Sequence, residues 1–187
     1  KGLAAHAEKH KATPDEILEA SGYLARGELA YVPHYEAPKR HGSVADFPLT
    51  FIDYKSRLNR EGRSQNLPWY QEFKKVDPAD VGWDDVLKMN PADGAKLGLK
   101  TGDMVRVTSL AGSIVVKLKL WEGVRPGTVA KAYGQGHWAY GRVAARDYAK
   151  AVPNGANNNE ILVDDYDRLS GATARNGGFT GVRIAKA

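Results

Sequence analysis

The sequence of 187 residues contains no cysteine. A chain without cysteine has no disulfide framework, no cysteine-ligated zinc or iron–sulfur centre, and no thiol nucleophile of its own. It also lacks any run of the roughly 18–20 consecutive apolar residues that a membrane-spanning helix needs. Its first ten residues are polar and have none of the apolar core of a signal peptide. Because there is no initiator methionine either, we expect a fragment or a processed product.

The charges of the chain are unequal in sign. Lys and Arg number 27 and Asp and Glu 22, which leaves a net charge of +5. This excess favours an anionic partner, which at this level is a nucleic acid, a membrane surface or a phosphorylated cofactor. The length suits one sizeable domain with an appended segment.

The first 46 residues differ from the rest in composition and in the pattern of apolar residues. Thr13-Pro14-Asp15-Glu16 has the pattern of a capping box, which predicts a helix over about residues 14–25 that ends before Gly27. Residues 31–42 are rich in Pro, His, Lys and Arg and have no period. We therefore predict an N-terminal helix and extended arm over 1–46, and a second domain over 47–187.

Short strands dominate the second domain. Apolar runs and period-2 alternation predict strands at 48–54, 104–108, 114–120, 128–133, 160–163 and 180–184. Ala111-Gly112 predicts a hairpin, and Asn90-Pro91 predicts a brief helix that ends at Gly98. Many short strands with frequent glycine indicate a mainly β fold with a few short helices, closed or nearly closed into a barrel.

A basic loop follows the first of these strands. Lys55, Arg57, Arg60 and Arg63 lie within nine residues, opposed by Glu61. Guanidinium groups match phosphate oxygens in geometry, so the loop is a candidate phosphate site. The alternative is an ordinary solvated loop.

Two further segments have candidate binding residues. Residues 134–139 match the G-x-G-x-x-A pattern, but no βαβ unit surrounds them, which argues against a Rossmann site. Gly136 allows close backbone approach, while His137 and Trp138 offer a polar edge and a stacking face; a tight barrel corner is the alternative. Residues 157–159 are three asparagines, whose carboxamides suit the edges of heterocycles and are also common in turns.

Other clusters favour structural roles. Asp164, Asp165 and Asp167 have no histidine nearby, and His6 and His10 lie at the terminus without the H-E-x-x-H order, so both are weak metal sites. Gly112-Ser113 is the pair at which pyruvoyl enzymes cleave themselves, but in a hairpin it indicates a turn. The sequence thus offers no self-contained catalytic group.

A longer signature runs from Met89 to Val107, MNPADGAKLGLKTGDMVRV. It resembles the C-terminal molybdopterin-dinucleotide-binding domain of the dimethyl sulfoxide reductase family of molybdenum or tungsten oxidoreductases. The pattern continues in order through 112–116, 124–129, 133–138, 157–162, 167–171 and 182–184, and covers about residues 47–187. Upstream, the segments 47–55, 63–65 and 67–70 are similar to the branch with polysulfide, thiosulfate, tetrathionate and arsenate reductase catalytic subunits.

The resemblance implies a six-stranded double-psi β-barrel of the aspartate-decarboxylase-like type. It also implies that this domain caps a bis(molybdopterin guanine dinucleotide) cofactor, with Mo or W, that is shared with upstream domains. Phosphates of such a cofactor would give the basic loop a ligand. The positions matched to cofactor contacts are Tyr54, Lys55, Arg57, Arg63, Ser64, Gln65, Gly136, His137, Trp138, Asn158, Asn159 and Arg183.

For the whole protein, the resemblance implies an oxidoreductase that acts on an inorganic sulfur or arsenic oxyanion or a similar substrate. The metal ligand and a 4Fe-4S cluster would lie upstream of Lys1, so we expect the fragment alone to be non-catalytic. Iron–sulfur electron-transfer and membrane-anchor subunits, and a periplasmic or exported, membrane-associated location, are family expectations. A basic β-barrel that binds nucleic acid is the alternative, but the four tryptophans are not interleaved with basic residues as such a barrel requires.

Overall fold

The computed structural model describes residues 2–59, 61–136, 155–166, 171–174 and 179–187. The chain divides into two compact units. One comprises Lys1–Lys39 and Asp164–Arg175, and the other comprises Arg40–Val163 and Asn176–Ala187. The sequence-based boundary between residues 46 and 47 stays a prediction.

The first unit contains the helices α1 (Gly2–Lys9) and α2 (Pro14–Ala20) and the 3-10 helix η1 (Gly27–Tyr31). The predicted capping box is confirmed, since Glu16 N donates to the Thr13 hydroxyl and Thr13 N donates to the Glu16 carboxylate.

The helix predicted over 14–25 is shorter than expected. It ends at Ala20 because Gly22, at a φ of +74°, adopts the left-handed conformation that terminates helices. Tyr23 N donates to Leu18 O and Gly22 N donates to Glu19 O, which are the two hydrogen bonds of a Schellman motif. Gly22 therefore ends the helix, and the prediction that it continues toward Gly27 was wrong.

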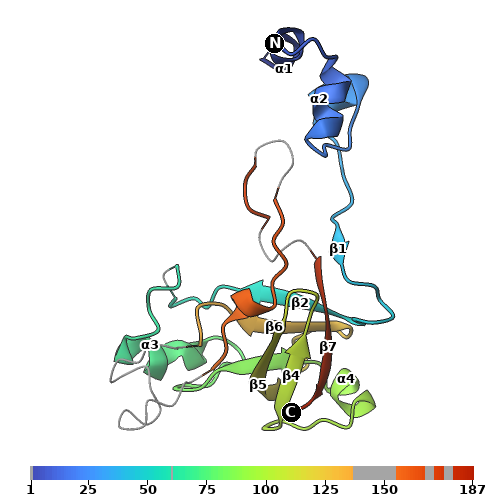
Figure 1. The fold of residues 1–187 in the computed structure, drawn as a ribbon. Coiled ribbons are helices and arrows are strands. Elements are labelled where there is room, and N and C mark those ends of the chain that lie inside the picture. Colours follow the sequence, from blue (N-terminus) through green and yellow to red (C-terminus); the bar gives the residue numbers. More distant parts are fainter. Residues whose placement is uncertain (1, 60, 137–154, 167–170, 175–178) are drawn as a thin grey trace. The chain divides into compact units, whose positions relative to one another are not determined.

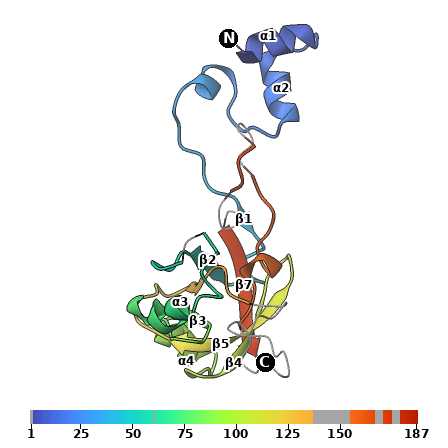
Figure 2. The same ribbon diagram turned by 90° about the vertical axis from the view of Figure 1, so that its left-hand side faces the viewer.

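The second unit is a closed six-stranded barrel. Its strands follow the order β7-β2-β6-β3-β5-β4, and β4 pairs back onto β7 to close the ring (Figures 1 and 2). The pairs β2–β6 and β3–β5 are parallel, and the other four pairs are antiparallel. A short strand, β1 (Arg40–His41), adds to β7 in parallel. The barrel strands are β2 (Leu49–Tyr54), β3 (Val86–Met89), β4 (Met104–Thr108), β5 (Ser113–Leu120), β6 (Thr128–Ala132) and β7 (Phe179–Lys186).

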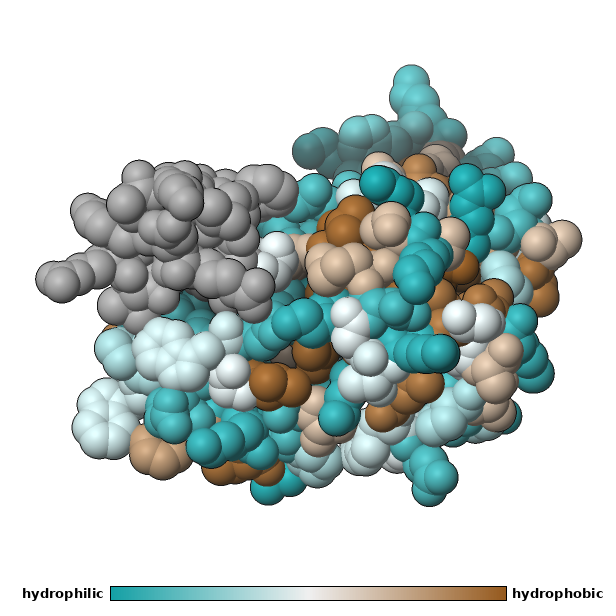
Figure 3. Space-filling model, turned by 90° about the horizontal axis from the view of Figure 1, so that it is seen from below, coloured by the Kyte–Doolittle hydropathy of each residue, from teal (hydrophilic) through white to brown (hydrophobic). Residues whose placement is uncertain are grey.

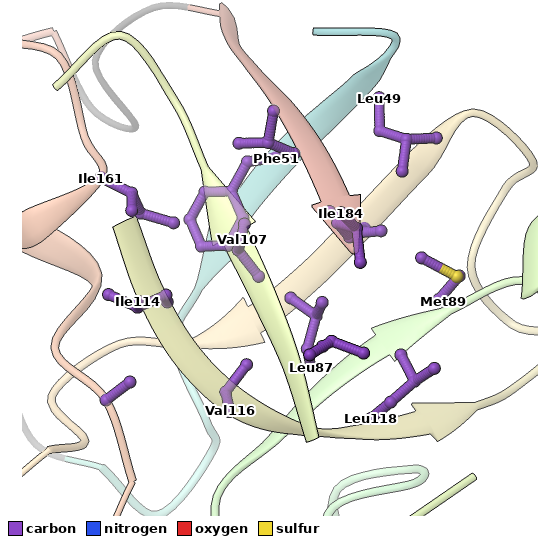
Figure 4. Packing of buried hydrophobic residues seen from close by; sticks show 14 of the residues in the cluster. Leu49, Phe51, Leu87, Met89, Val107, Ile114, Val116, Leu118, Ile161 and Ile184 are labelled. Carbon is purple, nitrogen blue, oxygen red and sulfur yellow. The ribbon is translucent and has the colours of Figure 1, made fainter. Parts of the chain in front are cut away.

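The interior of the barrel is filled by one hydrophobic cluster. Apart from Ile161, the side chains labelled in Figure 4 come from β2, β3, β4, β5 and β7 and point toward one another, with Phe51, Leu87 and Leu118 almost fully buried. Val129 of β6 belongs to the same cluster. Ile161, which follows the 3-10 helix η3 (Asn158–Glu160), completes the cluster from outside the sheet. On the outer face shown in Figure 3, hydrophobic side chains form separate patches among hydrophilic ones.

Most of the predicted elements are confirmed. The strands expected at 48–54, 104–108, 114–120, 128–133 and 180–184 correspond to β2, β4, β5, β6 and β7, and the hairpin joins β4 to β5. The helix after Asn90 is α4 (Pro91–Lys96), and Asn90 Oδ1 caps it by accepting from Ala92 N at 2.9 Å.

The strand predicted at 160–163 was wrong. The amides of Ile161 and Leu162 both donate to Asn158 O, so they close a local turn and pair with no strand. The apolar run marks burial of Ile161 rather than a strand. The elements that were not predicted include β3, which is buried on both faces and so has no alternation, and the helices α3 (Pro68–Phe73) and η2 (Lys74–Val76).

We expect Leu118→Ala to lower the free energy of unfolding by about 2–5 kcal/mol, because it leaves a cavity in the barrel interior. Leu110→Ala removes the same atoms from an exposed side chain at the hairpin and should change stability by less than about 0.5 kcal/mol. Urea denaturation of the two variants checks this, and equal losses would contradict the assigned core.

Candidate functional site

The loops that follow β2 and β6 leave the barrel at the same end. Because these strands are parallel neighbours, with Tyr54 opposite Ala132, their carboxyl ends meet at one edge. The contact extends by one residue, since Tyr133 N donates to Tyr54 O at 3.0 Å. The loop of residues 55–66 and the turn of residues 133–136 therefore begin side by side.

Asn59 ties this loop to this turn from a fully buried position. Its Nδ2 donates to Tyr133 O at 3.1 Å, and its Oδ1 accepts from Gly62 N at 3.1 Å. One carboxamide thus satisfies a backbone group of each segment and fixes the path of the loop across the turn.

Asp77 holds the beginning of the same loop. Its carboxylate accepts from Ser56 Oγ at 2.5 Å and from Arg57 N at 2.8 Å. Arg57 Nε lies 2.9 Å from Asp77 Oδ1, so the guanidinium is paired within the chain. This carboxylate, 20 residues further along the sequence, offsets a charge that we expected to face a ligand.

The other basic residues of the loop differ in their pairing. Lys55 Nζ lies 2.6 Å from Glu61 Oε1 at an exposed position. Arg63 is exposed and has no ion-pair partner among the described residues. Arg60 lies outside the described residues. Of the described basic side chains in the loop, Arg63 is therefore the one available to an external anion.

A pocket of about 400 Å³ lies where the loop meets the turn. Three of the predicted binding residues, Arg63, Gln65 and Gly136, line it together. His137 and Trp138 follow Gly136 directly but lie outside the described residues. The full lining, which we call the cofactor-candidate pocket, is Gly62, Arg63, Gln65, Asn66, Gly134, Gln135, Gly136 and Asn157.

Gln65 presents an unsatisfied donor in this wall. Its side chain is 5% exposed, and its buried Nε2 has no hydrogen-bond partner. Leaving such a donor unpaired costs about 1–3 kcal/mol, and an acceptor atom of a polar ligand in the pocket would satisfy it. The donor set of Gln65 and Arg63 therefore fits a ligand rich in acceptor oxygens or ring nitrogens.

Five of the lining residues were not among the predicted contacts. Gln135 is buried between two glycines at positive φ, and its Nε2 donates to Tyr70 OH at 2.9 Å. Burial, the largest effect, raises the pKa of Tyr70, so its hydroxyl stays protonated. The signal available in the sequence was a glutamine between two glycines, Gly134 and Gly136. The five are Gly62, Asn66, Gly134, Gln135 and Asn157.

The predicted asparagines lie beside this pocket rather than in its lining. Asn158 is buried, and its Nδ2 donates to Asp53 Oδ1 and to Ala132 O at 3.3 Å, which joins η3 to β2 and β6. Asn159 is exposed, and its backbone N donates to Asn157 Oδ1 at 3.1 Å. Of the three asparagines, it is Asn157 that lines the pocket.

Tyr54 faces a second and larger pocket, of about 780 Å³. Its hydroxyl donates to Asp80 Oδ1 at 2.6 Å, and Lys88 Nζ lies 2.8 Å from the same oxygen and 4.6 Å from the centre of the tyrosine ring. Burial, followed by the charge of Asp80, raises the pKa of Tyr54 far above its usual range.

The remaining two predicted contacts are also apart from the cofactor-candidate pocket. Ser64 is buried within the loop, next to two lining residues. Arg183 is exposed on β7 and lines a third pocket, of about 500 Å³, with Asp93 and Lys96. The structure thus does not bring Arg183 together with Arg63, Gln65 and Gly136, and its role as a cofactor contact stays a prediction.

Neither a metal site nor a membrane span is found in the part of the chain that the structure describes. No group of three or more His, Asp or Glu side chains there could hold a metal ion. No helix among these residues is long and apolar enough to cross a bilayer.

Comparison with known proteins identifies the family. The model of the molydopterin dinucleotide binding domain matches residues 63–178, which is more than half of the chain. The chain therefore belongs to this family, as the resemblance of its signature implied. Nothing in the fold or the comparisons favours the alternative of a nucleic-acid-binding barrel.

Two relatives match the chain from end to end. Both are arsenate respiratory reductase molybdopterin-containing subunits, from Chrysiogenes arsenatis (66% identical over 187 residues) and Shewanella sp. strain ANA-3 (56% over 186 residues). A tetrathionate reductase protein of Salmonella typhimurium is 28% identical over 149 residues, which are 72% of this chain and 14% of that protein. The chain spans 22% of the length of each arsenate reductase relative.

A solved structure supports the fold. Acetylene hydratase from Pelobacter acetylenicus aligns over 91% of this chain and 22% of its own, with a TM-score of 0.54 and 19% identity. At that identity the likeness concerns the fold alone.

We expect the stability of the chain to fall as the pH rises above about 10, the usual pKa of tyrosine. The folded state holds the pKa of Tyr54 above that value, so the stabilisation is complete below about pH 10 and is lost as the unfolded chain ionises. In Tyr54→Phe, the free energy of unfolding, measured by urea denaturation between about pH 9 and 11, should fall less steeply with pH than in the wild-type chain. Tyr35→Phe, at an exposed position, should keep the wild-type slope; equal slopes for both variants would contradict the buried environment of Tyr54.

We expect Gly134→Ala to close part of the cofactor-candidate pocket. A Cβ at this position would lie 2.3 Å from Gln65 Nε2, so the carboxamide must move. Gly98→Ala is the control, because Gly98 also has a positive φ but nothing within 4 Å of the added atom. Both variants should lose about 1–3 kcal/mol of stability through backbone strain. Crystal structures or NMR spectra should show a displaced Gln65 side chain in Gly134→Ala alone.

Proposed function

We propose that this chain binds a bis(molybdopterin guanine dinucleotide) cofactor at the cofactor-candidate pocket. The observation that carries the proposal is that two donors line the same pocket: the unsatisfied Gln65 Nε2, and the Arg63 guanidinium, which has no ion-pair partner among the described residues. Membership of the molydopterin dinucleotide binding domain family supports the same class of ligand.

Each of the three predicted residues in the pocket lining suits a different part of the cofactor. Arg63 would pair with a phosphate, which its planar guanidinium matches with two parallel hydrogen bonds. Gln65 would donate to an acceptor on a base or a pterin, and Gly136 lets the chain approach a planar ring. When bound, the cofactor supplies the metal-centred oxidation and reduction, while these residues supply position and electrostatics.

The other predicted contacts remain part of the proposal. Tyr54, Lys55, Arg57, Ser64, Asn158, Asn159 and Arg183 lie outside the pocket lining, and His137 and Trp138 lie outside the described residues. Lys55 and Arg57 have local carboxylate partners, so contact with a phosphate would require an exchange of partners. This makes Arg63 the better first target for mutation.

We further propose that the whole polypeptide belongs to an oxidoreductase that reduces an inorganic arsenic or sulfur oxyanion. The end-to-end match with two arsenate respiratory reductase relatives favours arsenate over tetrathionate or thiosulfate. Molybdenum or tungsten, a 4Fe-4S cluster in upstream domains, and partner electron-transfer and membrane-anchor subunits in an exported, membrane-associated location belong to this proposal. Oxidation of a reduced viologen dye with arsenate, tetrathionate or thiosulfate as acceptor distinguishes the substrates.

The N-terminal segment fits a role in packing against other domains of the same polypeptide. Between Lys1 and Lys39, several large hydrophobic side chains are more than half exposed, among them Leu24, Tyr31 and Tyr35. Exposed apolar groups of this size in one segment mark an interaction surface. We propose that this arm and the barrel join the upstream domains that share the cofactor.

We expect Arg63→Ala and Gln65→Met to weaken cofactor binding by about tenfold each, because each removes one charged or buried hydrogen bond. The measurement is made on the full polypeptide, expressed in a host that makes the cofactor. The bound dinucleotide is counted as the guanosine monophosphate released by acid, before and after dialysis.

Arg106→Ala is the matched control, since it removes one positive charge from an exposed position on β4. It should retain the wild-type guanosine content. A wild-type protein without guanosine monophosphate, or loss in Arg106→Ala equal to that in Arg63→Ala, would refute the proposed pocket.

A further inference from the structure

A buried ion pair lies next to the wall of the cofactor-candidate pocket. Lys131 Nζ is 2.8 Å from Asp85 Oδ2, and both side chains are almost fully buried. Lys131 belongs to β6 and lies on the same inward face as Val129, while Asp85 comes directly before β3. Neither residue was predicted to have a functional role.

The two charges hold a single residue by both of its backbone groups. Lys131 Nζ donates to Ala156 O at 2.8 Å, and Ala156 N donates to Asp85 Oδ2 at 2.9 Å. Gly155, at a φ of +77°, brings the chain so close that a Cβ there would lie 2.6 Å from Asp85 Oδ2. The pair therefore acts as a clamp on the segment of residues 155–157.

The clamped segment is part of the pocket. Asn157 lines it directly. A Cβ at Gly136 would lie 2.5 Å from both Ala156 C and Asn157 N, so the turn of residues 134–136 rests on the clamped backbone. A shift of Ala156 would consequently move two parts of the lining, Asn157 and Gly136.

We propose that Lys131 and Asp85 are positioning residues that fix the 155–157 wall of the cofactor-candidate pocket. The inference rests on the proposed function, because it assigns the pair to the same pocket. A buried ion pair is often no better for stability than a hydrophobic pair of equal volume. Its donors and acceptors are directional, however, and can hold a backbone segment in one place as hydrophobic side chains cannot.

The barrel contains a second buried ion pair that serves as a control. Lys88 Nζ lies 2.8 Å from Asp80 Oδ1, and both side chains are nearly as buried as those of the first pair. Lys88 also donates to Pro78 O, and it lines the larger pocket beside Tyr54. Lys88→Met therefore breaks a comparable pair with no hydrogen bond to the 155–157 segment.

The test compares Lys131→Met, Asp85→Asn and Lys88→Met in the full polypeptide. Hydrogen–deuterium exchange of the cofactor-free protein reports local opening of peptides over residues 155–162. We expect Lys131→Met to speed exchange there by about tenfold or more, since it removes a hydrogen bond from a charged donor. Asp85→Asn should have a smaller effect because the asparagine oxygen still accepts from Ala156 N, and it tests the clamp if Lys131→Met does not fold.

The second readout is the guanosine monophosphate released per polypeptide. It should fall in Lys131→Met and Asp85→Asn relative to the wild-type protein. Lys88→Met serves as the control for local exchange alone, because Lys88 contacts Tyr54, which remains among the proposed cofactor contacts. Unchanged exchange over 155–162, or an equal increase in Lys88→Met, would refute the clamp. Faster local exchange without loss of guanosine would refute the positioning role. The proposed function fails separately, if the wild-type protein itself contains no guanosine nucleotide.

Discussion

Because β2 and β6 run in the same direction, the segments that follow them emerge together at one end of the barrel. The rest of the candidate site depends on this parallel pair. Asn59 can reach the backbone of Tyr133 only because both loops start at that edge. The loop of residues 55–66 has no regular structure over its described part, and its path is set by side chains that bond backbone, above all Asn59 and Asp77. Binding groups on a loop are thereby held by a rigid sheet.

Family membership and geometry contribute different parts of the functional argument. The family model and the arsenate reductase relatives give the class of ligand, but they do not say which side chains meet it. Three of the twelve predicted contacts, Arg63, Gln65 and Gly136, line one pocket in the structure, while two others, His137 and Trp138, lie outside the described residues. It also separates charges by their partners, since Arg57 and Lys55 are paired locally, whereas Arg63 has no ion-pair partner in the part of the chain that the structure describes. Binding at this pocket remains our proposal.

The sequence predicted the elements whose signals are local. Alternation indicated the β4–β5 hairpin, and Asn90-Pro91 indicated the start of α4. Prediction failed where the pattern of apolar residues did not indicate the secondary structure. β3 is buried on both faces and so shows no alternation, and Ile161 is buried without belonging to a strand. Within the site, Arg63 and Gly136 were candidates from residue type and spacing as well as from the family resemblance, and Gln65 came from the resemblance alone. The partners that position them, such as Asn59 with Tyr133, are 74 residues apart, and no local pattern in the chain encodes such a contact.

A lysine inside the barrel has a consequence for how the strands assemble. Side chains of a strand alternate between its two faces, so a slip of one residue in the pairing of β6 would turn Lys131 outward and Ala130 inward. Asp85 would then remain buried without its partner, at a cost of several kcal/mol. Hydrophobic neighbours alone would tolerate many misaligned arrangements. The charged pair penalises them, and so it helps to specify which alignment of β6 with its antiparallel neighbour β3 the folding chain accepts.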